Sequence, residues 1–193
     1  MNRKRDPSEL KTLVSTSNIQ KALPKIAEGL NKYERLMENF LRSDVSKDTD
    51  FQKEFNHFYR LRRRSNFREI YYGFMESQKK ENPSFEKTVR YLKEKTGRVE
   101  ASFSSKLVAT LNPEQPIWDS IVLGNLELEI PKASDPDRLD RIVQLYSEIQ
   151  DWYADYLSSE TGQEAVRLFD EKYPENKISD LKKIDFILWQ IRD

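Results

Sequence analysis

Residues 102–126 read SFSSKLVATLNPEQPIWDSIVLGNL, and they place a proline-rich connection between two apolar runs. Pro113 and Pro116 prevent one continuous helix through this connection, because proline lacks a backbone N–H and its ring clashes with the preceding turn. The stretch therefore predicts two short helices, at 100–111 and 119–126. Similar helical patterns recur along the chain, and together they predict an all-α fold.

Length and composition agree with a helical protein. The chain has 193 residues, of which 37% are hydrophobic and 34% charged, with only 5 glycines. This length suits one domain, and this composition is typical of helix-rich proteins. We expect one helical domain over 1–193, either undivided or formed as a two-lobed helical bundle joined near 124–138. Prolines and a shift to acidic composition coincide in that segment.

Several classes of site are excluded or disfavoured by residues that the chain lacks. It has no cysteine, which excludes disulfides and thiolate metal sites, and it has neither GxGxxG nor GxxxxGK[ST]. Its longest apolar runs span about one helical turn, too short to cross a membrane. We therefore expect no metal or other cofactor, no membrane contact and a cytoplasmic location.

The net charge of zero hides two unlike parts of the chain. Residues 127–175 contain 13 acidic against 5 basic residues, so the rest of the chain is basic. The densest basic point is RLRRRSNFR at 60–68, which predicts a surface that faces an anion. The predicted nucleic-acid-binding arginines are Arg60, Arg62, Arg63, Arg64 and Arg68.

Apolar residues at helical spacing predict further helices. They lie within 9–43 and 51–61, from Phe67 onward, at 84–97, 138–157 and 163–173, and from Ser179 onward. Within 9–43, Leu36, Met37, Phe40 and Leu41 are expected on one buried face, and Pro24 marks either a helix start or a kink. The final helix is expected to carry an apolar stripe flanked by Trp189. The alternating LELEI at 126–130 predicts a short strand.

The segment FYRLRRRSNFREIYYGF, residues 58–74, has two interpretations. Arginines interleaved with rings can form a surface that contacts phosphates and stacks on bases. Rings at helical intervals are also typical of a core, with the arginines in solvent, and this is the favoured reading. The single histidine, His57, lies beside this segment, and we favour a structural or surface role for it over a catalytic one.

Asp119 follows Pro116, Ile117 and Trp118 and stands where a helix begins. It is expected to cap that helix, because an aspartate at this position accepts hydrogen bonds from free backbone N–H groups. A carboxylate fixed in this way can also act as a base or stabilise a cationic transition state. Lys106 is its predicted cationic companion, against the alternative of an ordinary surface lysine.

The stretch SSKLVATLNPEQPIWDSIV, at 104–122, carries a resemblance. A short helix, a loop that ends in proline, and an aspartate that begins a new helix resemble the helix-hairpin-helix DNA glycosylases. Their signature ends in Pro-Val-Asp-Thr-His-Val, and the segment is similar to a family of uncharacterised bacterial proteins with a glycosylase-like fold. The matching residues are Pro116, Ile117, Asp119, Ser120 and Val122.

The resemblance implies a two-lobed helical fold in which Asp119 takes the catalytic position. The sequence departs from the signature, since Trp118 is an insertion, the histidine and the following arginine are absent, and the glycine-rich hairpin is reduced to Gly97. Glu100 stands nearest to the hairpin lysine of the bifunctional members, so Lys106 is not carried over as that nucleophile. The resemblance thus implies a divergent relative with altered or lost base excision.

Two functions from different classes follow. In the first, the protein binds DNA through the five arginines, with Trp118 as a wedge or pocket wall, and acts on an extruded base through Asp119 and Lys106. In the second, it is a non-catalytic helical module, and its C-terminal helices bind a protein partner or a second copy of the chain.

Overall fold

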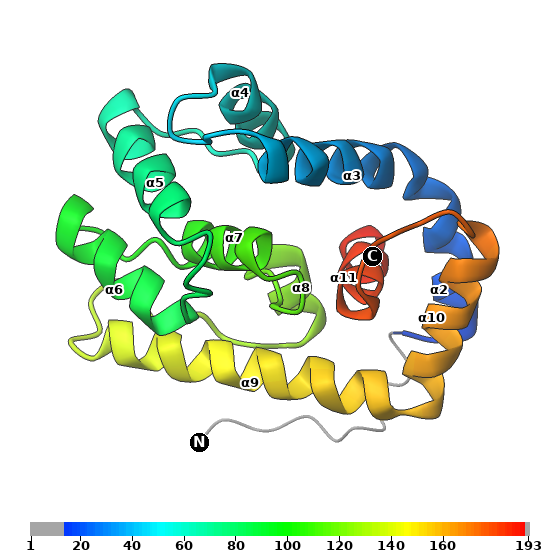
Figure 1. The fold of residues 1–193 in the computed structure, drawn as a ribbon. Helices are drawn as coiled ribbons and strands as arrows, with labels where there is room; N and C mark the ends of the chain where they lie inside the picture. Colours follow the sequence, from blue (N-terminus) through cyan, green and yellow to red (C-terminus); the bar gives the residue numbers. More distant parts are fainter. Residues whose placement is uncertain (1–13, 192–193) are drawn as a thin grey trace. The chain divides into compact units, whose positions relative to one another are not determined.

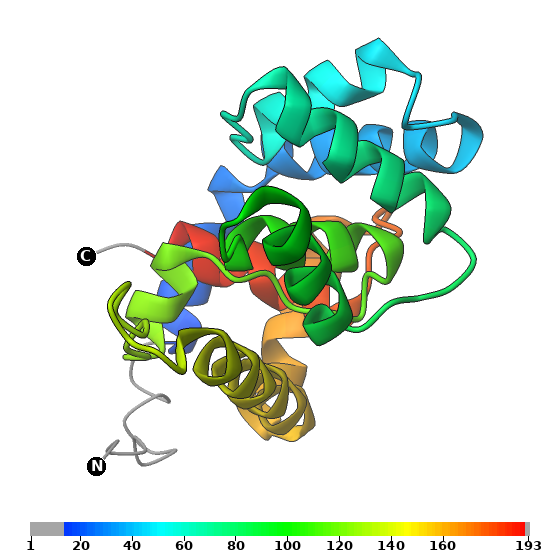
Figure 2. The same cartoon turned by 90° about the vertical axis from the view of Figure 1, so that its left-hand side faces the viewer.

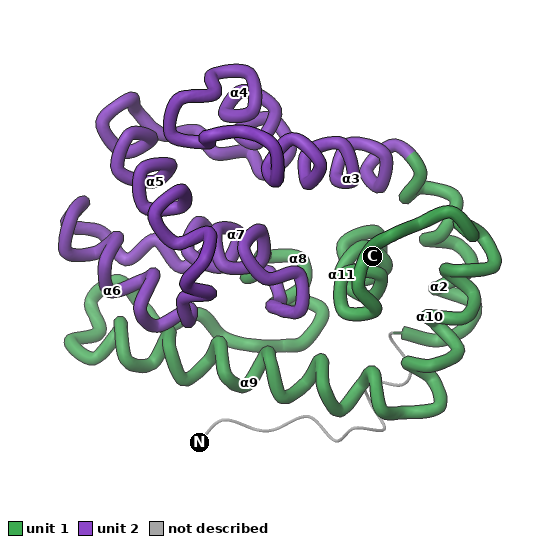
Figure 3. Tube along the Cα trace, in the orientation of Figure 1, with its two compact units in different colours: residues 1–27, 118–193 green, residues 28–117 purple. Residues whose placement is uncertain are grey.

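The computed structural model describes residues 14–191, and that part of the chain is helical, without a strand. The prediction of an all-α fold is confirmed. The chain divides into two compact units: unit 1 joins residues 1–27 to 118–193, and unit 2 spans 28–117 (Figure 3). Leu10 and Leu13, which belong to the first predicted helix, lie outside the described residues.

Unit 2 is built from five helices that follow one another along the chain. They are α3 (Ala27–Arg42), α4 (Thr49–Phe58), α5 (Ser65–Ser77), α6 (Phe85–Thr96) and α7 (Ala101–Leu111). Helices α3, α4 and α5 lie side by side in two perpendicular views (Figures 1 and 2). Helix α6 packs against both α5 and α7.

The core of unit 2 is rich in aromatic rings. The rings of Phe40 and Phe51 join α3 to α4, with centroids 6.1 Å apart. Further along, Phe55 contacts Tyr72 of α5 edge to face at 5.7 Å. Such pairs stabilise a core beyond the area they bury. Burial therefore accounts for most of the aromatic pattern in the sequence, as the favoured interpretation of residues 58–74 expected.

The helix predicted at 84–97 is capped at both of its predicted ends. The Ser84 hydroxyl accepts a hydrogen bond from the backbone N–H of Lys87, at 3.1 Å, and begins α6. Gly97 ends this helix in the left-handed conformation, with φ of 72°, which glycine adopts without strain. One predicted core residue is wrong: Leu41 is 79% exposed, because it follows the buried Phe40 around the helix to the solvent side.

Unit 1 is built from the two ends of the chain. Its elements are α2 (Thr16–Ala22), the short 3₁₀ turn η1 (Leu23–Lys25), α8 (Ser120–Asn125), α9 (Arg138–Ser158), α10 (Glu160–Lys172) and α11 (Asp180–Gln190). Helix α11 packs against α2, η1, α8, α9 and α10. It is therefore buried on all sides from Leu181 to Leu188, rather than along one stripe as expected.

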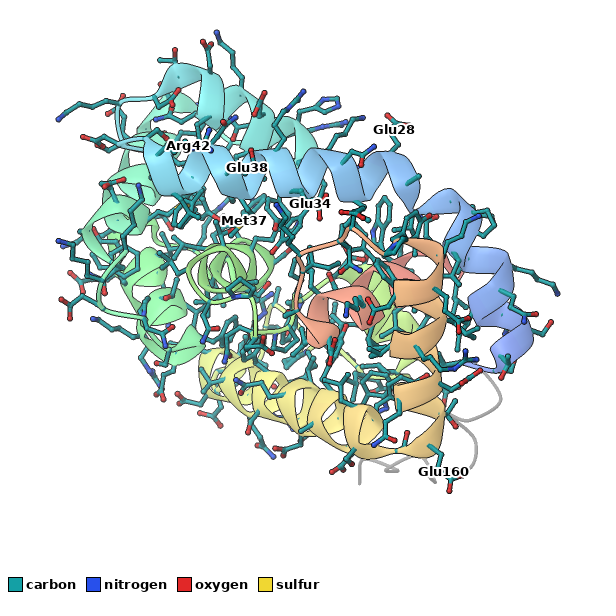
Figure 4. The ribbon with its side chains drawn as sticks, turned by 45° about the vertical axis from the view of Figure 1, so that its right-hand side comes forward. Glu28, Glu34, Met37, Glu38, Arg42 and Glu160 are labelled. Carbon is teal, nitrogen blue, oxygen red and sulfur yellow. The ribbon has the colours of Figure 1, made fainter. Side chains whose placement is uncertain are left out.

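Helices α9 and α10 meet at a corner made by one residue. Ser159 ends α9 and begins α10, and its hydroxyl donates to the carbonyl oxygen of Tyr156 and accepts from the N–H of Gly162. Glu160 projects from the first turn of α10 (Figure 4). Gly162 is required here, because a Cβ at this position would overlap the carbonyl oxygen of Tyr156.

Two connections differ from the expectation. The prediction of a strand at 126–130 is wrong, because Leu126 ends α8 and Glu127 turns the chain with a positive φ of 51°. No neighbouring strand exists in the described residues to pair with it. The segment 124–138, near which two lobes were expected to join, lies within unit 1. Pro24 lies in the first turn of η1, which begins at Leu23 and separates α2 from α3, so it marks the start of a short 3₁₀ helix and not a kink in one long helix.

Candidate functional site

The arginine turn, residues 60–64, follows the last turn of α4. The backbone N–H of Tyr59 closes the helix on the carbonyl of Phe55, and that of Leu61 reaches the carbonyl of Asn56, each at 2.9 Å. Arg60 lies between them with a positive φ of 53°. Tyr59 and Leu61 are buried, so they fix the turn to the core of unit 2.

The five predicted arginines differ in what they contact. Arg63 makes an ion pair of 2.9 Å with the buried Glu100, and its guanidinium lies 5.3 Å from the centre of the Phe103 ring. It therefore anchors the turn to the start of α7. Arg60, Arg62 and Arg64 are exposed, and Arg68 is half-buried. Within residues 14–191, Arg62 and Arg64 have no ion-pair partner.

Most rings beside the arginine turn are buried and leave little surface for stacking. Buried aromatic residues in this region are Phe55, Tyr59, Phe67, Tyr71, Tyr72 and Phe74. Burial raises the pKa of Tyr71 well above its ordinary value, because ionisation would place a charge inside the core. Bases cannot stack on rings that the protein already covers, so the contact that this surface offers is to phosphate.

Lys106 is engaged within unit 2. Its ammonium group donates to the carbonyl oxygen of Tyr59, at 3.2 Å, and lies 5.4 Å from the centre of the Phe103 ring. Tyr59 ends α4, and a cation at a helix C-terminus is stabilised by the free carbonyls there. Lys106 thus supports the arginine turn. Lys106 belongs to unit 2, whereas Asp119 belongs to unit 1.

Asp119 caps α8. One of its carboxylate oxygens accepts a hydrogen bond of 2.8 Å from the backbone N–H of Ile121, and its backbone is extended, as is usual for such a cap. The prediction of a cap is confirmed, and the catalytic role stays a prediction. Trp118 is buried, with 5% of its surface exposed, so its ring is not presented to a ligand in solvent.

Lys182, Asp185 and Tyr153 form a buried polar cluster in unit 1. The ammonium of Lys182 contacts the carboxylate of Asp185 at 2.7 Å, with side chains only 5% and 11% exposed. The hydroxyl of Tyr153 donates to the other oxygen of Asp185, at 3.3 Å. Burial raises the pKa of Tyr153, and the negative charges of Asp185 and Asp119 raise it further. Burial and then the Asp185 charge likewise raise the pKa of Tyr146.

Sequence patterns do not distinguish this cluster from charges on a surface. Lys182 and Asp185 are spaced as an ordinary surface pair one helical turn apart, and such charges are usually solvated. Only the packing of α11 against the other helices of unit 1 shows that they are enclosed.

A pocket between α3 and α4, called the α3–α4 pocket below, is a second feature that the sequence did not predict. Its volume is about 220 Å³, and it is lined by Lys32, Arg35, Leu36, Lys53, Glu54, His57 and Phe58. His57 is exposed at this pocket, in agreement with the surface role favoured for it. The basic lining residues are far apart in the sequence, so only the packing of α3 against α4 brings them together.

Residues 14–191 contain no group of three or more histidine, aspartate or glutamate side chains placed to hold a metal ion. None of the described helices is both long enough and apolar enough to cross a membrane.

Comparison with protein-family models, curated proteins and solved structures found no match to this chain. The function is therefore inferred from the contacts and exposure of the residues themselves.

Proposed function

We propose that this protein binds DNA through the arginine turn. The observation that carries the proposal is the exposure of Arg62 and Arg64 on a turn whose neighbours are fixed, with no ion-pair partner for either in the described residues. Guanidinium groups bind phosphate oxygens through two parallel hydrogen bonds. Charges without a carboxylate partner are available for this contact.

The surroundings of the turn favour a preformed binding surface. Tyr59 and Leu61 are buried on one side, and the ion pair between Arg63 and Glu100 holds the middle of the turn. Binding then costs less ordering of the backbone than it would for a free loop. Arg62 and Arg64 occupy alternate positions around Arg63, so their guanidinium groups can contact separate phosphates.

The proposed contact is to the DNA backbone rather than to bases. Most aromatic residues near the turn are buried, and Phe58 and Phe103 are half-buried, which leaves little of the stacking platform expected of a single-strand reader. Phosphate contacts carry no direct sequence information. We therefore expect binding that depends little on DNA sequence and weakens steeply with salt, with a dissociation constant on the order of 10⁻⁴–10⁻⁶ M at physiological salt.

The test is the salt dependence of binding to a labelled DNA duplex, followed by fluorescence anisotropy. The double variant Arg62→Ala, Arg64→Ala should bind more weakly, and its plot of log affinity against log salt should be shallower by about 2. Arg90→Ala is the matched control, because Arg90 is an arginine of unit 2 already paired with Glu86. An unchanged slope of log affinity against log salt in the double variant would contradict the proposal.

A second candidate function, removal of a base from DNA, is favoured by one observation. Asp119 is half-buried, and its negative charge contributes to the raised pKa of the enclosed Tyr153, whose hydroxyl donates to Asp185. A carboxylate in such surroundings can stabilise the positive charge that develops on a sugar as its base leaves. This role agrees with the resemblance to the DNA glycosylases.

Asp119→Asn separates catalysis from capping, because asparagine caps a helix about as well as aspartate. Release of damaged bases from duplex DNA should fall by about 10²–10³-fold while the melting temperature is kept. Unchanged release would leave Asp119 with its capping role alone. If neither DNA binding nor base release is found, the non-catalytic helical module becomes the better proposal.

The partner surface of that module would differ from the one expected. The C-terminal helices were predicted to bind a partner, but Leu181 to Leu188 of α11 are buried, and this helix packs against α8, α9 and α10 of its own unit. A protein partner or a second copy would therefore need to use other faces of the C-terminal helices.

A further inference from the structure

The α3–α4 pocket gathers basic side chains from two helices. Lys32 and Arg35 come from α3, whereas Lys53 and His57 come from α4, one helical turn apart on the same face. The lining thus holds three permanent cations and the only histidine of the chain. Charges of one sign that converge on a hollow attract a counter-ion, because its apolar walls focus the field.

The single carboxylate in the lining is already satisfied. One oxygen of Glu54 lies 3.2 Å from the guanidinium of Arg35, and the other accepts a hydrogen bond of 3.0 Å from the amide of Asn39. Arg35 remains 64% exposed despite this contact, so most of its donors face outward. A guanidinium carries five N–H groups, which leaves donors for a second oxyanion.

The two lysines have partners outside the pocket lining. Lys32 pairs with Glu28, and Lys53 pairs with Asp50 at 2.9 Å, and both carboxylates are more than 80% exposed. Figure 4 shows Glu28 projecting from the first turn of α3. Exposed pairs of this kind are weak, and each ammonium has two further protons to donate. A ligand in the pocket can therefore recruit both lysines.

The floor of the pocket is apolar. Leu36 is buried at its base, and the half-buried ring of Phe58 packs against Tyr33, with centroids 6.0 Å apart. An apolar floor holds fewer competing water molecules and strengthens hydrogen bonds at the rim. The volume of about 220 Å³ is below the range of about 300–1,000 Å³ typical of drug-sized ligands. It suits one small anionic group with at most a sugar attached.

We propose that the α3–α4 pocket binds a phosphate group. Phosphate offers several acceptor oxygens and up to two negative charges, which match a guanidinium fork and two ammonium groups that approach from different helices. The phosphate can belong to a small phosphomonoester or to the backbone of a nucleic acid. The site goes beyond the proposed DNA contact, because it shares no residue with the arginine turn.

The single histidine makes the pocket directly observable. The carbon-bound ring protons of His57 give the only imidazole signals in the proton NMR spectrum, since the chain has no other histidine. Inorganic phosphate at neutral pH should shift these signals in a saturable way, whereas sodium chloride at equal ionic strength should not. Signals that do not move with phosphate, or that move equally with chloride, would overturn the proposal.

Variants of the lining assign the response to this pocket. Arg35→Ala and Lys53→Ala should each weaken phosphate binding about tenfold, since each removes a charged donor. Glu54→Gln should tighten it, because the only carboxylate of the lining is neutralised. Lys47→Ala is the matched control: Lys47 is an exposed lysine of unit 2 that pairs with Asp44 outside the pocket. Equal affinities for phosphate in Lys47→Ala and in both lining variants would overturn the assignment of phosphate binding to this pocket.

The source of the phosphate is distinguished by three ligands. Thymidine 5′-monophosphate, thymidine and an oligonucleotide without a terminal phosphate are compared through the same His57 signals. A response to the monophosphate alone supports a phosphomonoester site, and a response to the oligonucleotide supports a backbone contact. The Arg62→Ala, Arg64→Ala variant should keep its response to inorganic phosphate. Failure of the arginine turn to bind DNA is thereby distinguished from failure of the pocket.

Discussion

Unit 2 exposes clustered cations, whereas unit 1 encloses charged side chains in its interior. Arg60, Arg62 and Arg64 of unit 2 are exposed, but Lys182 and Asp185 of unit 1 are buried. In the sequence, both clusters are short runs dense in charged residues: RLRRR at 60–64 and KKID at 182–185. The density of charged residues in a stretch of sequence therefore does not by itself predict whether their side chains are exposed. What differs is the packing, because α11 is surrounded by helices and the arginine turn is not.

This difference has an energetic consequence. A charge enclosed by protein loses its hydration, and only a close partner with good geometry compensates for that loss. An exposed charge keeps its water, so its removal costs little. The Lys182–Asp185 pair of unit 1 should therefore be sensitive to single charge substitutions that the exposed arginines of unit 2 tolerate.

The largest expected effect is the loss of the buried pair. Asp185→Ala leaves the Lys182 ammonium enclosed without its partner and removes the acceptor of the Tyr153 hydroxyl. We expect the free energy of unfolding to fall by about 3–5 kcal/mol, measured by urea titration with circular dichroism. Asp50→Ala, which removes the exposed partner of Lys53, should change it little. Equal losses in the two variants would contradict the claim that the buried pair matters more for stability than the exposed one.

A double substitution separates the effect of charge from the effect of side-chain volume. Replacing Lys182 with Met and Asp185 with Leu removes both charges together and keeps the volume similar. Because no unpaired charge remains, the double variant should be more stable than Asp185→Ala. A double variant as unstable as the single one would mean that the volume of the side chains, and not their charge, governs this part of α11.

The next effect concerns backbone packing. Gly162→Ala should lower the free energy of unfolding by about 1–3 kcal/mol, because the added methyl group overlaps the carbonyl of Tyr156 and the corner must open. Gly73→Ala in α5 of unit 2 is the matched control, since nothing lies within 4 Å of its new Cβ. That variant should be more stable than the wild type by about 0.5–1 kcal/mol. Thermal unfolding of both variants provides the measurement.

The smallest effect is the acid response of an exposed carboxylate in unit 2. The Ser46 hydroxyl, with help from Lys47, lowers the pKa of Asp44 from 3.8 to about 2. The stabilisation is therefore complete above pH 3.8 and is lost as the pH falls toward 2. Asp44→Asn should flatten the dependence of stability on pH in this window. If stability falls as steeply with decreasing pH in Asp44→Asn as in the wild type, other carboxylates govern the loss of stability in acid.

Local signals in the sequence predict most of the helices. Apolar spacing locates α4, α5, α9 and α11, and the capping residues Ser84, Asp119 and Ser179 begin their helices as expected. These features depend on neighbours within one or two turns, which the sequence displays directly. The exception is Leu41, because apolar residues on both sides of a helix leave the position of the buried face undetermined.

Features that depend on packing between distant segments were not predictable. The α3–α4 pocket needs Arg35 and His57 to meet, and the buried pair needs α11 to be covered on all sides. The candidate site was predicted in part: the arginine cluster is exposed, as a charge run suggests, yet Arg63 is held by Glu100. Nothing in the sequence separates Arg63 from its neighbours on either side.

The serine shared by α9 and α10 restricts how the chain can vary in length. Ser159 closes one helix and opens the next, so no linker residue exists there to absorb an insertion. One added residue that extended α9 would rotate everything after it by about 100° around the helix axis. Ala165 and Phe169 would then leave the interior. Insertions and deletions should therefore be tolerated in exposed connections such as 131–137, and selected against at this corner.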